Sequence, residues 1–160
     1  MISPELIEQR KSELDDFYAE AISVLVEFVG QMGINPAPQV LIHAADYLPL
    51  LSTALKNVEL DDDDEKIWLH ARVAYFVGEY FAQRYQGSWY VNEDEGSVFY
   101  GRYVVGRFSA WNDMALMVDP FEVGRSYIGS PVPRNLQALV DSVDAELKDR
   151  STRGESHRAS

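Results

Sequence analysis

The sequence predicts an α+β fold, in which helices precede and follow a small antiparallel sheet of about three strands. Apolar side chains recur at spacings of three and four residues before residue 86 and after residue 119, as in helices buried on one face. Between these segments, residues 88–118 are rich in aromatic and β-branched residues, which favour strands. The 160 residues include no cysteine. We expect residues 1–148 to form one domain whose core needs no disulfide.

The first predicted helix begins at Ser3 and Pro4, a cap followed by a proline that suits the first helical turn. Gly30 and Gly33 end it. Its apolar face contains Leu14, Phe17, Ala21, Leu25 and Phe28, and its other face contains Glu13, Asp15, Asp16, Glu20 and Glu27. This helix is therefore expected to be buried on one side and acidic on the other.

Residues 39–58 are predicted to form two short helices, because Pro49 should break or kink a single helix near Tyr47. The run from residue 59 to residue 65 is acidic apart from Leu60, and we interpret it as a solvated connector and helix cap. A calcium loop is a less favoured interpretation, since the run lacks the central glycine of such loops.

A long central helix is predicted from Glu65 to Tyr85, packed on the sheet. Gly87 should end it by adopting a left-handed conformation. Gly78 lies inside it and costs about 1 kcal/mol relative to alanine, which indicates that the first helix or the sheet crosses closely there. The buried stripe comprises Leu69, Val73, Phe76, Val77, Tyr80 and Phe81.

Two strands, residues 88–92 and 98–108, should form a hairpin around residues 93–96, followed by a third strand at 115–118. Arg102 and Arg107 would fall on opposite faces of an unbroken strand, so Gly101 or Gly106 is a candidate bulge. Asp119, Pro120 and Glu122 then begin a helix that ends at Gly129, with Glu122 placed to reach back as in a capping box. A last helix follows from Asn135. The polar residues 149–160 are predicted to be a disordered tail.

The charge of −12 is divided unevenly along the chain. Residues 1–96 contain 18 acidic and 6 basic residues, whereas residues 97–160 contain 8 of each. Such a surface repels phosphate backbones, so no nucleic-acid partner is expected. It favours a basic protein partner, although acidity that only maintains solubility is an equally good explanation.

No constellation of residues predicts catalysis, and no cofactor is implied. His43, His70 and His157 lie in different elements without metal-ligand spacing, so no metal site is expected. The glycine spacings match neither a phosphate-binding loop nor a dinucleotide site. Glu79 is a possible buried base, but a glutamate at the helix edge paired with Arg84 or Arg102 is the favoured interpretation.

Trp111 lies in a polar loop between Ala110 and Asn112. Tryptophan is frequent at binding hot spots, so Trp111 is a candidate contact residue. Folding back onto the core is the more favoured alternative for this side chain.

Four segments carry a resemblance. They are Gly78-Glu79-Tyr80-Phe81, Gly87-Ser88-Trp89-Tyr90-Val91, Gly101-Arg102-Tyr103-Val104-Val105-Gly106 and Val118-Asp119-Pro120-Phe121. Over residues 65–147 the chain resembles small bacterial α+β proteins of the toxin-immunity type. The resemblance implies binding to a toxin, and it assigns no functional residue.

We therefore expect a cytoplasmic, acidic, non-catalytic binding protein that neutralises a basic toxin or effector. No membrane segment is expected. The alternative is a small-ligand-binding domain or enzyme with a pocket between central helix and sheet, using Glu79, Tyr80, Arg102 and Tyr103. The predicted partner-binding residues are Asp61, Asp62, Asp63, Asp64, Glu65, Glu93, Asp94, Glu95 and Trp111.

Overall fold

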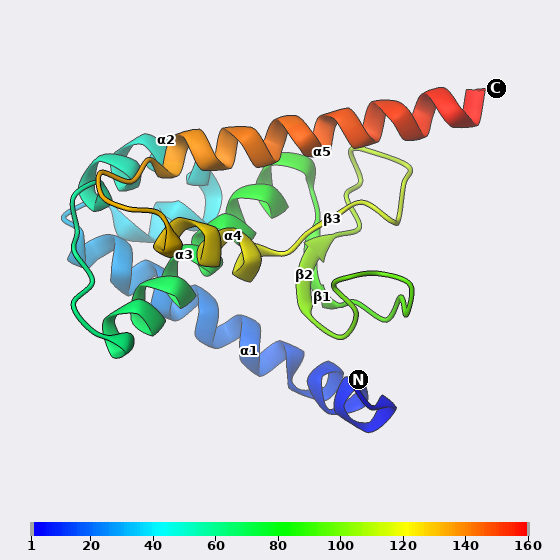
Figure 1. Ribbon diagram of the computed structural model, residues 1–160, viewed down its shortest axis with the longest axis horizontal. Coiled ribbons are helices and arrows are strands. Elements are labelled where there is room, and N and C mark those ends of the chain that lie inside the picture. Colours follow the sequence, from blue (N-terminus) through cyan, green and yellow to red (C-terminus); the bar gives the residue numbers. More distant parts are fainter. Residues whose placement is uncertain (1, 160) are drawn as a thin grey trace.

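The computed structural model describes residues 2–159 of the chain, with side chains to residue 153 (Figure 1). It confirms the predicted α+β class, with helices packed on a three-stranded antiparallel sheet. The elements in order are α1 (Pro4–Gln31), the 3-10 helix η1 (Ala37–Gln39), α2 (Val40–Leu55), α3 (Asp63–Tyr85), β1 (Ser88–Val91), β2 (Tyr103–Gly106), β3 (Met117–Val118), α4 (Pro120–Gly129) and α5 (Leu136–Ala159).

Helix α3 is the centre of the molecule. Helix α1 runs along one long edge and α5 along the other, with α3 between them and the sheet at the end where α3 finishes (Figure 1). Helix α4 packs closely along α3, while α2 contacts both α3 and α5. The core is therefore mainly helical, and its fully buried large side chains include Phe28, Phe76, Phe81 and Tyr127.

The sheet has the order β1-β2-β3 with both pairs antiparallel. Ser88 pairs with Gly106 and Val91 with Tyr103. At the junction of sheet and helix, Trp89 lies on Gly78: a Cβ on that glycine would come within 1.9 Å of the indole ring. The close crossing predicted at Gly78 is confirmed, and β1 makes it.

Helix α2 contains a kink, but its cause is a side chain from α3 and not the proline. The break from helical geometry lies at His43, with φ −125° and ψ 43°, and the helix continues through Pro49. At the break, the Ala44 amide donates to Oε1 of Gln83 at 2.8 Å, and Nε2 of Gln83 donates to the Val40 carbonyl at 2.9 Å. The Gln83 amide thus takes the place of one helical hydrogen bond. The predicted break near Tyr47 was wrong.

Most helix ends follow the predicted caps. Ser3 Oγ accepts from the Leu6 amide, and Asp119 Oδ1 accepts from the amides of Phe121 and Glu122. Glu122 does not reach back, because its carboxylate bonds Arg102 and Arg125 instead. The left-handed residue that ends α3 is Gln86, with φ 56° and ψ 56°.

Gly87 has a different role from the predicted one. A Cβ at this position would lie 2.5 Å from both the Gly106 carbonyl oxygen and the Phe108 ring. The glycine allows β1 to begin directly beside β2.

The second strand is shorter than predicted. Residues 97–102 form turns, and Gly101, with φ +80°, donates its amide to the Asn92 carbonyl at 2.7 Å. The bulge proposed to place Arg102 and Arg107 on the same face is not needed, because both residues lie outside β2, which ends at Gly106. Arg107, just after the strand, has φ 52°. High β propensity alone misassigned this stretch.

The predicted disordered tail from residue 149 is a continuation of α5, which extends to Ala159. Arg150 pairs with Glu146, and Arg153 with Asp149, each one helical turn apart. Ser151 is buried, so the body of the protein covers part of this extension. None of the helices within residues 2–159 is both long and apolar enough to cross a bilayer.

Candidate functional site

The predicted acidic group at residues 61–65 caps the start of α3. Asp62 Oδ1 accepts from the Glu65 amide at 2.8 Å, and Glu65 Oε2 accepts from the Asp61 amide at 2.5 Å. The arrangement is similar to a capping box, but Glu65 bonds the amide of Asp61, one residue before the cap, and not that of the cap residue Asp62. The five side chains remain exposed, and those of Asp61, Asp63 and Asp64 form no salt bridge with a described residue.

The second predicted group, Glu93 to Glu95, lies in the turn that follows β1. Glu93 pairs with Lys11 of α1 at 3.2 Å, and Asp94 Oδ1 accepts from the Gly96 amide at 3.0 Å. All three residues are exposed. This group is therefore placed at the N-terminal end of α1.

Trp111 folds back onto the protein. It is half-buried, and its ring centroid lies 4.2 Å from that of Tyr85 and 5.7 Å from that of Phe108. This packing explains the position of the tryptophan without a partner, so the favoured sequence interpretation is the one the structure supports.

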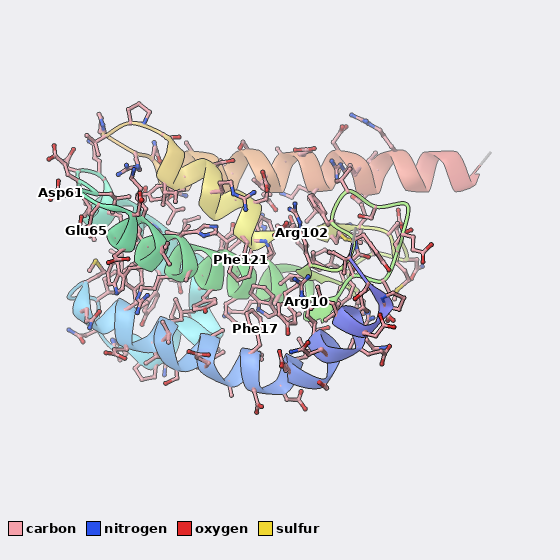
Figure 2. All side chains as sticks on the ribbon, turned by 60° about the horizontal axis from the view of Figure 1, so that its bottom comes forward. Arg10, Phe17, Asp61, Glu65, Arg102 and Phe121 are labelled. Atoms are coloured by element: carbon pink, nitrogen blue, oxygen red, sulfur yellow. The ribbon has the colours of Figure 1, made fainter. Side chains whose placement is uncertain are left out.

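The two acidic groups do not meet. One lies at the start of α3, whose 23 residues span about 34 Å at 1.5 Å per residue, and the other lies beyond β1, which follows the end of that helix. Figure 2 shows Asp61 and Glu65 at one end of the molecule and Arg10, the neighbour of Lys11, well away from them. A single compact site made from both groups is excluded.

Helix α1 joins these two ends. Lys11 near its start contacts Glu93, and Phe28 near its end packs edge-on against Trp68 of α3. The solvent side of α1 has exposed carboxylates along most of its length. We call them the α1 acidic face: Glu5, Glu8, Glu13, Asp15, Asp16, Glu20 and Glu27. The sequence showed this acidity, but the contact set predicted from it omitted the helix, because only the fold places α1 between the two groups.

The bases of α1 do little to neutralise this face. Arg10 turns away from it and donates to the carbonyl of Gly101 (Figure 2). Lys11 is shared between Glu8 at 3.5 Å and Glu93 at 3.2 Å. Apart from Glu8, no carboxylate of this face forms a salt bridge with a described residue, so its negative charge remains largely uncompensated.

Carboxylates form salt bridges far more often in the C-terminal part of the chain than in the N-terminal part. Among the described residues, salt bridges involve two of the 18 acids in residues 1–96 and five of the eight in residues 97–160. The paired set is Asp119, Glu122, Asp144, Glu146 and Asp149. The excess negative charge is thus both localised in the N-terminal part and left free of the protein's own cations.

Two apolar side chains are exposed next to the acidic connector. Ile67 is 66% exposed and Trp68 is 37% exposed, one turn into α3. Arg72 lies over the Trp68 ring at 4.5 Å. Large apolar groups beside charge are the composition that protein interfaces favour at their centres and rims.

The residues of the alternative pocket are not brought together. Arg102 pairs with the buried Asp119 at 2.7 Å, and Tyr103 stacks on Phe17 with centroids 4.2 Å apart. Tyr80 lies edge-on to Phe81. These contacts belong to the packing between elements and define no common cavity with Glu79.

Glu79 itself differs from the favoured sequence interpretation. It is 6% exposed, and it pairs with neither arginine, since Arg84 pairs with Asp144 and Arg102 with Asp119. Burial raises the pKa of its carboxyl, while hydrogen bonding from Tyr18, Trp89 and Gln83 acts in the opposite direction. Its Oε1 is fully buried and has no hydrogen-bond partner among the described residues.

Comparisons with protein-family models, with curated proteins and with solved structures find no match to this chain. Within the part of the chain that the structure describes, no three His, Asp or Glu side chains are grouped so that they could hold a metal ion. His70 instead bonds the Phe121 carbonyl through Nε2 at 2.7 Å.

Proposed function

We propose that this chain is a cytoplasmic, non-catalytic binding protein of the immunity type, which neutralises a basic toxin or effector by covering its positive surface. The observation that supports the proposal is the uncompensated charge of the α1 acidic face, continued by residues 61–65 at one end and Glu93 to Glu95 at the other. A strip of this kind suits an elongated basic surface better than a single pocket does.

Electrostatics gives such a strip two effects. It accelerates the encounter with a positively charged partner, and it disfavours acidic competitors. Ile67 and Trp68 add exposed apolar area at one end of the strip, where desolvation on contact would lengthen the lifetime of the complex. The charge of the strip therefore favours rapid association. The apolar side chains at its end favour slow dissociation.

The test is a binding measurement with the protein encoded by the neighbouring gene, at low and at high salt. The test variant neutralises the middle of the α1 acidic face with Glu13→Gln, Asp16→Asn and Glu20→Gln. The control variant removes the same number of charges from the exposed side of α5 with Asp141→Asn, Glu146→Gln and Asp149→Asn.

We expect the test variant to lose at least about tenfold in affinity, mainly through slower association, and the control variant to bind almost as the wild type does. Higher salt should weaken the wild-type complex more than that of the test variant. Absence of binding at low salt, or an equal loss in both variants, would contradict the proposal.

A further inference from the structure

A hollow of about 180 Å³ lies where α1, α3 and the start of β1 converge. Its walls include the rings of Tyr18 and Trp89, with Ala82 from α3. Asp15 and Ser88, both exposed, line it as well. Asp15 also belongs to the α1 acidic face, so the hollow borders that face.

Glu79 lies behind this hollow. It precedes Ala82 by one turn of α3, and its two neighbours Tyr18 and Trp89 are also walls of the hollow. The sheet, the helix α1 and Gly78, which admits the Trp89 ring, together keep the carboxyl away from bulk water. Glu79 is not itself a wall of the hollow, and its carboxyl is buried behind Tyr18 and Trp89.

The protein supplies no cation to this position. Among the described residues that line the hollow none is basic, and the nearest candidates on the same helix, Arg84 and Arg72, make other contacts. A buried carboxyl with an unpartnered oxygen is costly and usually acquires a paired charge or a hydrogen-bond donor. Oε1 of Glu79 has no such partner among the described residues, although Tyr18, Trp89 and Gln83 hydrogen-bond the carboxyl, so this oxygen can accept from one further donor.

We propose that the hollow binds the primary ammonium group of an alkylamine, between the rings of Tyr18 and Trp89 and above Glu79. Ammonium groups are attracted to the faces of aromatic rings, most strongly to tryptophan. Asp15, which lines the hollow, and Glu79, which is buried behind Tyr18 and Trp89, attract an ammonium group when their carboxyls are ionised. The hollow is comparable in size to an engineered cavity of about 150 Å³ that admits benzene, so a chain of about five heavy atoms fits.

Two kinds of ligand carry an alkylammonium group of this size: a free amine, and the lysine side chain of a protein. Both present an ammonium group on a flexible chain of four carbons. The inference stands on the hollow alone and does not rest on the proposed toxin partner. If the source is a lysine side chain, the hollow provides an anchoring point beside the α1 acidic face.

The experiment follows the indole Nε1–H signal of Trp89 by NMR during titration of the full chain with n-butylammonium chloride. The signal is assigned as the one retained in both Trp68→Phe and Trp111→Phe. Equal concentrations of sodium chloride and of n-butanol control for salt and for the apolar chain. We expect a saturable shift with butylammonium and none with either control.

Two variants locate the site. Glu79→Gln keeps the shape of the side chain and should weaken binding at least about tenfold, since hydrogen bonds to a charged group are worth about 1.5–3 kcal/mol. Ala82→Met leaves Glu79 in place, fills the hollow and should abolish binding. Glu27→Gln removes an exposed carboxylate elsewhere on α1 and should leave the affinity unchanged.

A titration with Nα-acetyl-lysine-methylamide distinguishes the two sources. Tighter binding than that of butylammonium indicates a protein side chain, and weaker binding indicates a free amine. The proposal is overturned if neither compound saturates the signal, if Glu79→Gln binds as the wild type does, or if Ala82→Met still binds.

Discussion

At the level of single residues, the contact between Gly78 and Trp89 joins α3 to the sheet. An alanine Cβ at position 78 would lie 1.9 Å from the indole ring, inside its van der Waals surface. Overpacking of this kind costs about 1–3 kcal/mol, and the gain in helix propensity returns about 1 kcal/mol. We expect Gly78→Ala to lower the free energy of unfolding by about 1–2 kcal/mol in urea denaturation.

Gly129 is the matched control for this substitution. It ends α4, no atom lies within 4 Å of a Cβ built there, and its φ is not positive. Gly129→Ala should change stability by no more than about 0.5 kcal/mol, or stabilise slightly through the unfolded state. Equal effects at the two positions would show that the Trp89 contact is not what requires Gly78.

Glu79 gives a second prediction at this scale, for the dependence of stability on pH. Burial raises the pKa of its carboxyl above the ordinary value of 4.5, so the folded state holds the proton more tightly than the unfolded state does. The stabilisation is fully present below the unfolded pKa and is lost as the pH rises through the folded pKa. Glu79→Gln should remove this decline, measured by urea unfolding from about pH 4 to about pH 8.

Asp144 changes the stability with pH in the opposite direction to Glu79, so the two contributions must be separated. Desolvation alone would raise the pKa of Asp144, but hydrogen bonds from Tyr85 and Arg84 outweigh it and hold the pKa below 3.8. Its contribution is lost as the pH falls, at the acid end of the titration. The difference between wild type and Glu79→Gln isolates Glu79, and parallel curves at all pH values would show that Glu79 titrates normally.

At the level of elements, Gln83 couples α3 to the kink in α2. Its amide satisfies the Val40 carbonyl and the Ala44 amide, both on fully buried residues. Gln83→Ala leaves two buried backbone groups without partners, at about 1–3 kcal/mol each. We expect a loss of about 2 kcal/mol or more in the free energy of unfolding.

Two further variants test whether this loss comes from the hydrogen bonds of Gln83. Gln9→Ala removes an exposed glutamine whose amide bonds only Glu13 one turn away, and it should cost less than about 0.5 kcal/mol. Gln83→Glu keeps the acceptor for Ala44 but removes the donor for Val40, so it should be destabilising too. A neutral result for Gln83→Ala would mean that α2 can straighten without cost.

The elements that the sequence predicted well are those whose ends are defined by local chemistry. Ser3, Asp62 and Asp119 begin helices by bonding amides two or three residues ahead, and such signals are visible in the sequence. The kink at His43 could not be predicted, because its cause is a side chain 40 residues away. For the same reason Glu79 was assigned to a helix edge, although the fold buries it beneath Tyr18 and Trp89.

The candidate site was predictable only in part. The sequence showed that the negative charge lies before residue 97, and the structure adds that this charge is left unpaired there. The acidic strip also requires that α1 lies between the two predicted acidic groups. No local sequence pattern encodes that position of the helix. The alternative pocket failed for a related reason, since Arg102 and Tyr103 are neighbours in the chain but contact Asp119 and Phe17.

At the scale of the whole molecule, the division between paired and unpaired carboxylates predicts how stability responds to salt. Like charges on the α1 acidic face repel one another, including Asp16 and Glu20 one turn apart. A protein keeps such repulsion at the expense of its own stability, and binding to a positive partner would relieve it. Raising the salt concentration should therefore stabilise the free protein.

The two triple variants make this prediction specific. Neutralising Glu13, Asp16 and Glu20 removes repulsive neighbours and should stabilise the free protein by roughly 0.5–1 kcal/mol at low salt, with the gain disappearing at high salt. Neutralising Asp141, Glu146 and Asp149 breaks two pairs with Arg150 and Arg153, and should destabilise it by roughly the same amount. Thermal unfolding at two salt concentrations measures both. If neutralising the α1 carboxylates destabilised the protein, those groups would be part of its own structural support, and the case for a partner-binding face would fail.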